Sequence, residues 1–125
     1  MLTDAQIERA KQETKYSLPS PHHEHPDCVR IAYAWLDAQK KTKSTTAKTM
    51  ALKHIIEAWG GRYVSTSDVE VAATLHPEIR GTYPHFNISA RLTEPSKNRL
   101  AGISEAFKHD YNARHDPKTY SVQEE

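Results

Sequence analysis

The chain has 125 residues, with 17 Lys and Arg residues against 16 Asp and Glu residues and a formal net charge of +1. This length is typical of one domain, and no apolar run approaches the roughly 18 residues that a membrane-spanning helix needs. The start, MLTDAQIERAKQETK, has no apolar signal region, so we expect a cytoplasmic protein that does not enter a membrane. The single cysteine, Cys28, excludes an intramolecular disulfide and a zinc site built from several cysteines.

The apolar content predicts a small core. Leu, Ile, Val and Phe make up 21 of the 125 residues, a low fraction that accompanies disorder when the net charge is also large. Because the net charge is close to zero here, we expect an ordered core with polar margins.

The first elements are a helix and an arm. A helix is predicted for residues 1–16, because Thr3 and Gln6 have the spacing of a capping box. Residues 17–27 (SLPSPHHEHPD) contain three prolines and cannot be helical, which indicates a Pro/His-rich linker or extended arm.

A second helix is predicted from Pro26 to about Lys40, since proline suits the first turn. Its apolar positions follow i, i+3, i+4, i+7 and i+8, the core-facing stripe of an amphipathic helix. They are Cys28, Ile31, Ala32, Trp35 and Leu36.

Three further helices follow from capping and stop signals. Hydroxyl residues at 44–46 are expected to cap a helix that Gly60-Gly61 ends, and a short strand is expected at 62–64. Ser65 or Ser67 would cap the next helix, which Pro77 stops. Pro84 would begin another helix running to about Thr93, and the apolar spacing in 100–107 suggests a last one. Residues 112–125 have few apolar groups and are predicted to form a flexible tail. The predicted fold is therefore mainly α, with at most a short β element.

Two runs within residues 46–99 resemble a known motif. SDVEVAATL (67–75) looks like the first helix, and PHFNISARLTE (84–94) like the recognition helix, of a winged-helix or helix-turn-helix domain. The words Ile88-Ser89-Ala90-Arg91-Leu92 are similar to the V-S-x-R-L wording of small prokaryotic regulators of phage or plasmid type. The resemblance implies a helical DNA-binding-like domain over residues 28–111. It also implies a role in transcription regulation or as an accessory factor, with double-stranded DNA and possibly a second copy of the chain as partners.

The resemblance places candidate base contacts on the predicted recognition helix. With Ile88 and Leu92 facing the core, Asn87 and Arg91 share a polar flank, and His85 is a further candidate. Asn pairs bidentately with adenine and Arg with guanine. The alternative is that Asn87 is a polar residue of the first turn and Arg91 a surface charge.

Candidate phosphate contacts come from the distribution of charge. Residues 28–63 hold seven basic and two acidic residues, and there is no acidic residue between Ala38 and Ile56. Lysines next to Ser and Thr hydroxyls suit phosphate oxygens, although a solvated loop would have the same composition. The candidates are Lys40, Lys41, Lys43, Lys48, Arg80, Lys97 and Arg99.

The histidine-rich arm suggests a third function, metal binding. Imidazole and thiolate groups bind zinc or nickel, and the candidate ligands are His22, His23, His25 and Cys28. Their spacing is not that of a closed site, and Cys28 also falls on the apolar stripe of its helix. A solvated arm that titrates near neutral pH is the alternative.

Enzyme signatures do not occur: there is no G-x-S-x-G, Walker or G-x-G-x-x-G motif. We therefore expect neither catalysis nor a cofactor. The class that competes with DNA binding is a non-enzymatic protein-interaction module, in which the helices of Trp35 and Trp59 build the core and the other helices engage a host protein.

Overall fold

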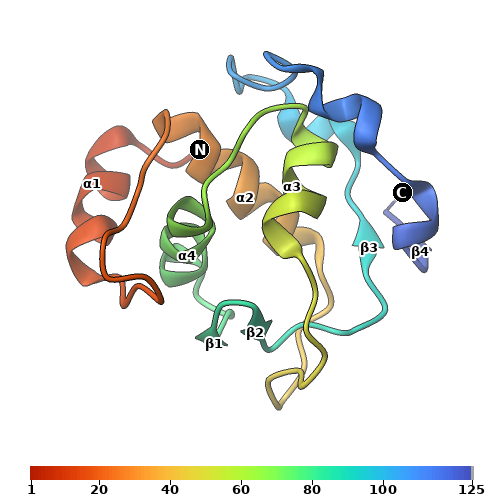
Figure 1. The fold of residues 1–125 in the computed structure, drawn as a ribbon, viewed down its shortest axis with the longest axis horizontal. Coiled ribbons are helices and arrows are strands. Elements are labelled where there is room, and N and C mark those ends of the chain that lie inside the picture. Colours follow the sequence, from red (N-terminus) through yellow and green to blue (C-terminus); the bar gives the residue numbers. More distant parts are fainter. Residues whose placement is uncertain (125) are drawn as a thin grey trace.

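Four α-helices supply most of the regular backbone in the computed structural model, which describes residues 1–124 (Figure 1). They are α1 (Asp4–Glu13), α2 (Pro26–Ala38), α3 (Leu52–Gly60) and α4 (Thr66–Leu75). The strands of the described chain are two residues long each. The prediction of a mainly α fold with a small β element is confirmed. Within residues 1–124, every helix is too short or too polar to cross a membrane.

Three helix ends lie where the sequence predicts them, and of the two predicted caps of α4, Ser65 and Ser67, the structure uses Ser65. Thr3 caps α1 in a capping box with Gln6, and Ser65 caps α4 in a box with Asp68. Gly61 follows α3 with φ 66°, the left-handed conformation that glycine adopts without steric cost.

The core forms where α2 crosses α4, with α1 packed on α4 and α3 on the other side of α2 (Figure 1). Two fully buried tryptophans anchor it. Trp35 Nε1 donates a hydrogen bond to the Tyr120 hydroxyl (2.9 Å), and Trp59 Nε1 donates one to the Pro95 carbonyl (3.1 Å). Both indole groups are thereby satisfied inside the core, as buried N–H groups require.

Helix α3 begins later than predicted. The hydroxyl residues at 44–46 do not cap it, and Ala51 occupies the N-cap position without a side-chain hydrogen bond. Residues 39–51 form a loop instead, because their backbone pairs with residues 86–89. The Thr42 and Thr46 amides donate to the carbonyls of Asn87 (2.8 Å) and Phe86 (3.0 Å).

The helix predicted for residues 84–93 is wrong. Strands β1 (Gly81–Thr82) and β2 (His85–Phe86) form an antiparallel hairpin through the cis peptide bond between Tyr83 and Pro84, and the chain continues without helix, through bends at 87 and 90–91, to β3 (Thr93–Glu94). The backbone groups of 86–89 bond to residues 40–46 and to the Arg80 carbonyl, and not in the i to i−4 pattern of a helix. Residues 67–75 are helical as expected, but residues 84–94 do not form the helix that the resemblance places there.

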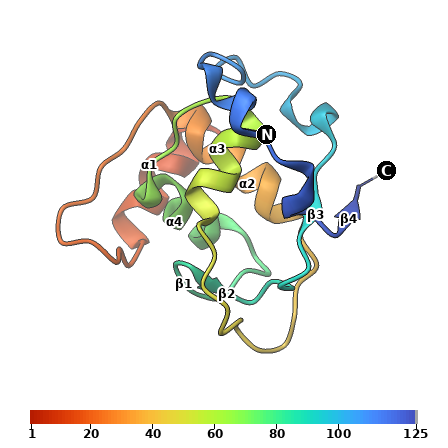
Figure 2. The same ribbon diagram turned by 45° about the vertical axis from the view of Figure 1, so that its right-hand side comes forward.

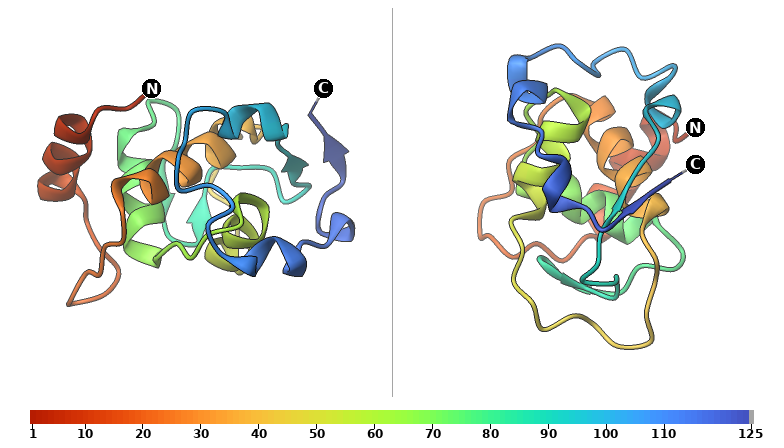
Figure 3. Two further views of the ribbon diagram at one scale, coloured as in Figure 1. Left: turned by 90° about the horizontal axis from the view of Figure 1, so that it is seen from above. Right: turned by 90° about the vertical axis from the view of Figure 1, so that its right-hand side faces the viewer.

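The C-terminal part also differs from the prediction. The 3-10 helix η1 (Lys97–Leu100) and turns replace the last helix, and 62–64 is not a strand. Residues 112–124, predicted to form a flexible tail, have mostly exposed side chains but contain regular elements: η2 (Asp110–Arg114) and η3 (Pro117–Thr119) lead to β4 (Val122–Gln123), which pairs in parallel with β3 (Figure 3). The reason is long-range, since this segment supplies the hydroxyl partner of Trp35.

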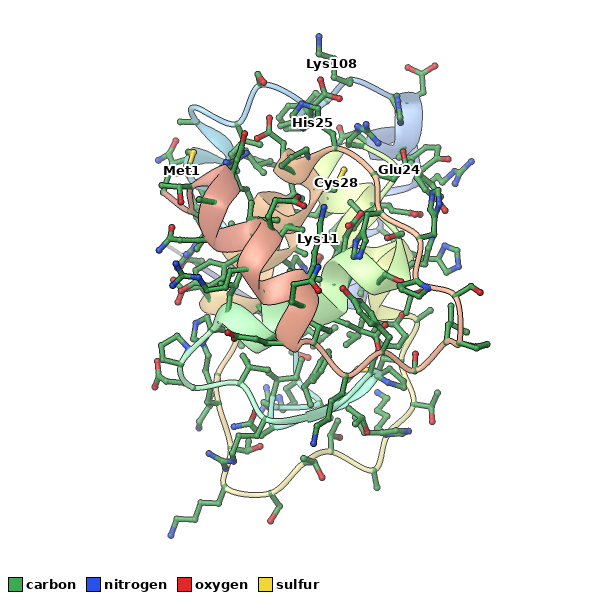
Figure 4. All side chains as sticks on the ribbon, turned by 90° about the vertical axis from the view of Figure 1, so that its left-hand side faces the viewer. Met1, Lys11, Glu24, His25, Cys28 and Lys108 are labelled. Carbon is green, nitrogen blue, oxygen red and sulfur yellow. The ribbon has the colours of Figure 1, made fainter. Side chains whose placement is uncertain are left out.

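The arm of residues 17–27 is not a detached linker. It runs beside α4 (Figure 4), where the Ser17 amide donates to Glu70 Oε2 (2.8 Å) and the His22 amide to Ser67 Oγ (3.1 Å). Residues 1–27 therefore belong to the same packed unit as the helices that follow.

Candidate nucleic-acid interface

Two segments without any acidic residue meet at one end of the molecule. Residues 38–56 and 79–93 together hold seven basic residues and no Asp or Glu. Backbone hydrogen bonds join them, among them the bond from the Ser89 amide to the Lys40 carbonyl (2.9 Å). Figures 1 and 2 show the loop 39–51 and the β1–β2 hairpin together at the bottom of the view. We call the exposed cations of this region the basic end: Lys40, Lys43, Lys48, Arg80 and Arg91.

The loop lysines divide into exposed and engaged groups. Among the described residues, none forms an ion pair or a hydrogen bond with the ammonium group of Lys40, Lys43 or Lys48. Lys41 instead donates from Nζ to the Asp37 carbonyl (2.7 Å), and partial burial lowers its pKa. Arg80 Nη2 donates to the Lys43 carbonyl (2.8 Å) and so holds the loop in place while staying exposed.

Asn87 fastens the two segments together from inside. The residue is only 1% exposed. Its Oδ1 accepts from the Arg80 amide (2.5 Å), and its Nδ2 donates to the carbonyls of Glu78 (2.9 Å) and Thr42 (3.3 Å). The prediction that Asn87 contacts a base is wrong for this structure, because a buried amide with all its groups engaged does not reach a base edge.

The other two candidate base contacts differ from each other. His85 is half-buried and its Nδ1 lies 3.0 Å from the Thr46 carbonyl, so the ring also ties the hairpin to the loop. Arg91 is exposed, but it lies in a bend and not on a helix. Of the three, Arg91 alone is exposed.

Lys97 and Arg99 lie outside the basic end, and each has partners within the protein. Lys97 Nζ donates to the Trp59 carbonyl (2.7 Å) and lies over the Trp59 ring, 5.6 Å from its centroid. Arg99 forms ion pairs with Glu124 (2.6 Å) and Asp37 (2.8 Å), and these carboxylates raise its pKa. Both cations therefore stabilise the fold, and their role as phosphate contacts stays a prediction.

The histidines of the arm serve the fold as well. The His23 ring lies between the Asp68 carboxylate (2.9 Å) and the Tyr16 hydroxyl (3.0 Å), while His25 caps α2. His22 pairs with Glu24.

Cys28 is buried (Figure 4), and burial raises the pKa of its thiol to about 12. Within residues 1–124, no three His, Cys, Asp or Glu side chains come together in a way that could hold a metal ion. The predicted metal ligands therefore do not form a site.

The sequence carries a charge pattern that indicates the basic end independently of the resemblance to a recognition helix. Residues 79–93 lack acidic residues just as 38–56 do, so the two segments share a charge pattern. The contact between the two segments, however, depends on hydrogen bonds between residues that are far apart in the sequence, such as that of Asn87 with Thr42 at a separation of 45.

No family model, curated protein or solved structure matches this chain. What the geometry itself defines is a small helical domain with one basic end.

Proposed function

We propose that this protein binds double-stranded DNA through the basic end and acts in the cytoplasm as a regulatory or accessory factor. The observation that carries the proposal is the convergence of residues 38–56 and 79–93, two acid-free segments, on one surface. Lysines next to exposed hydroxyl groups, as in the loop 39–51, suit phosphate oxygens.

The remaining surface supports an oriented mode of binding. Outside the two segments the chain holds ten basic and sixteen acidic residues. This negative remainder repels DNA, so electrostatic steering turns the basic end towards the duplex. The formal net charge of +1 thus conceals a strongly polarised molecule.

The chemistry of the contacts predicts modest sequence preference. Phosphate contacts position a protein but carry no sequence information directly. Arg91 is the exposed side chain best suited to read a base, since a guanidinium pairs bidentately with guanine. A homodimer would present two basic ends to half-sites one helical turn apart, and the mass of the complex in solution tests this stoichiometry.

The test is a fluorescence-anisotropy titration of a short random-sequence duplex at two salt concentrations. Five phosphate contacts give a slope of log K against log salt of about −4.5, so affinity should fall about 500-fold between roughly 50 and 200 mM salt. Removing two contacts should flatten the slope to about −2.7.

Paired charge reversals locate the contact. Lys43→Glu/Lys48→Glu should weaken DNA binding at low salt more than tenfold. The control, Lys108→Glu/Lys118→Glu, makes the same change in net charge on exposed lysines elsewhere and should retain most of the DNA affinity. Equal losses in both double variants, or no binding at low salt, would rule out this interface and favour the protein-interaction module.

A further inference from the structure

Phe107 lies at the end of the molecule opposite the basic end, where Figure 4 shows the neighbouring Lys108 projecting into solvent. The residue is 50% exposed, and its backbone has φ 64°. A bulky side chain rarely adopts a positive φ, because its Cβ crowds the following carbonyl group. This conformation costs free energy in the folded protein, and the half-exposed ring does not offset the cost by full burial.

The backbone around Phe107 completes the end of helix α3. The Phe107 amide donates to the Gly60 carbonyl (2.8 Å), and the His109 amide donates to the Gly61 carbonyl (2.9 Å). These bonds satisfy carbonyl groups that the last turn of a helix leaves without partners. Glycine or asparagine at position 107 would make the same bonds and would adopt the left-handed conformation at a lower cost. The capping role therefore explains the backbone at this position but not its aromatic side chain.

The Phe107 ring rests on a rigid support. A Cβ atom at position 61 would lie 2.8 Å from Phe107 Cδ1, so the ring packs directly on Gly61, where no side chain intervenes. Lys97 Nζ lies 5.4 Å from the ring centroid and is itself held by the Trp59 carbonyl (2.7 Å). The exposed part of the ring is thus presented in a fixed orientation, which lowers the entropic cost of placing a planar group against it.

Further aromatic rings and cations follow Phe107 along the chain. The rings of His109 and Tyr111 meet edge to face at 5.7 Å, and the Arg114 guanidinium lies over the Tyr111 ring, 4.2 Å from its centroid. Residues 106–115 hold two basic residues and one acidic residue, whereas the chain outside the two acid-free segments is acidic as a whole. We call this surface the aromatic end: Phe107, Lys108, His109, Tyr111 and Arg114.

Aromatic rings next to cations favour a ligand that has both planar rings and negative charges. Single-stranded nucleic acids have both, because their unpaired bases stack on aromatic side chains while Lys and Arg contact the phosphates. A duplex fits less well, since its bases already stack on one another. An acidic peptide would use the cations but would bring no planar ring to match Phe107.

We propose that the aromatic end binds single-stranded nucleic acid, with one base stacked on Phe107 and the phosphates next to Lys108 and Arg114. This inference does not depend on duplex binding by the basic end.

The experiment is a fluorescence-anisotropy titration of a labelled oligothymidylate of about twelve nucleotides, a length that one such surface can hold. The protein is the full chain with Lys43→Glu/Lys48→Glu, so that the basic end does not contribute. Two phosphate contacts on a single strand give a slope of log K against log salt of about −1.4. This slope is much shallower than that expected for a duplex on the basic end, because stacking does not depend on salt in the same way.

Substitutions at position 107 test the stacking. In the same background, Phe107→Leu keeps an apolar side chain without an aromatic face and should weaken binding about five- to a hundredfold. Phe107→Tyr should retain the affinity, and Val122→Ala, which shortens an exposed apolar side chain elsewhere, should also retain it. If Phe107→Leu does not fold, Lys108→Glu at an exposed position should weaken binding of the single strand severalfold.

Three results would overturn the proposal. They are equal affinity of the Phe107→Leu and Phe107→Tyr proteins, an affinity that Lys108→Glu leaves unchanged, and no saturable binding up to about 100 μM protein. The last would leave this end of the molecule to a protein partner. Duplex binding is measured with a different probe and with other variants, so a failure of one proposal is distinguishable from a failure of the other.

Discussion

Replacing Asn87 by alanine should destabilise the fold, because the side chain joins the two segments of the basic end. The substitution removes three hydrogen bonds and leaves the Arg80 amide and the carbonyls of Glu78 and Thr42 without their partner. A hydrogen bond contributes about 0.5–1.5 kcal/mol net, and a buried group left unpaired costs about 1–3 kcal/mol.

Solvent reduces this loss, since Arg80 and Glu78 are exposed residues whose backbone groups water can reach after the substitution. We therefore expect the free energy of unfolding to fall by about 2–4 kcal/mol. For a domain of this size that corresponds to a melting temperature lower by roughly 8–16 °C.

Urea unfolding followed by tryptophan fluorescence measures the change, and Asn98→Ala is the matched control. The Asn98 side chain is exposed, so its removal should alter the free energy of unfolding by less than about 0.5 kcal/mol. An Asn87→Ala protein as stable as the control would refute the argument.

Three further predictions concern other parts of the fold. Tyr120→Phe leaves the Trp35 indole N–H without its acceptor and should lower the free energy of unfolding by about 1–2 kcal/mol in urea; an unchanged midpoint would contradict this. Arg99 holds the pKa of the Glu124 carboxyl below its ordinary value of 4.5, so this contribution is present at neutral pH and is lost as the pH falls through the lowered pKa. Arg99→Gln should therefore flatten the loss of stability below about pH 5, measured as melting temperature against pH; a parallel curve would argue against the pairing. The buried Cys28 thiol, with its pKa raised to about 12, should resist iodoacetamide at pH 8 and react in urea; rapid labelling of the folded chain would show that it is accessible.

The parts of the fold that short-range chemistry determines could be predicted from the sequence. The capping boxes at Thr3 and Ser65 involve residues three positions apart, and Gly61 terminates α3 through its own backbone conformation. Each needs only a few neighbouring residues, and each lies where the sequence places it.

The hairpin region shows why the other parts of the fold could not be predicted from the sequence. Ile88 and Leu92 have the i, i+4 spacing of a helix, and both are buried. Two buried positions four apart also occur in an extended chain that packs against a distant loop, so the spacing does not distinguish the two structures. The partner, residues 40–46, lies more than 40 positions away and carries no local signal of the pairing.

In the candidate site, too, local properties could be predicted from the sequence and long-range contacts could not. Clustering of lysines in the sequence correctly indicates a basic loop, because charge density is a local property. The position of Lys97 and Arg99 away from it depends on which carboxylates and carbonyls the folded chain brings to them, such as Glu124, and that is decided by tertiary packing.

The hydrogen bond between Trp35 and Tyr120 joins two residues that are 85 positions apart in the sequence and links the C-terminal segment to the core. During synthesis, at about 5–20 residues per second, the first three helices leave the ribosome seconds before the segment that covers Trp35 exists. An incomplete chain therefore exposes an aromatic surface that the finished protein buries. Products that stall before Tyr120 is added should therefore expose part of the Trp35 side chain and aggregate more readily than the folded chain.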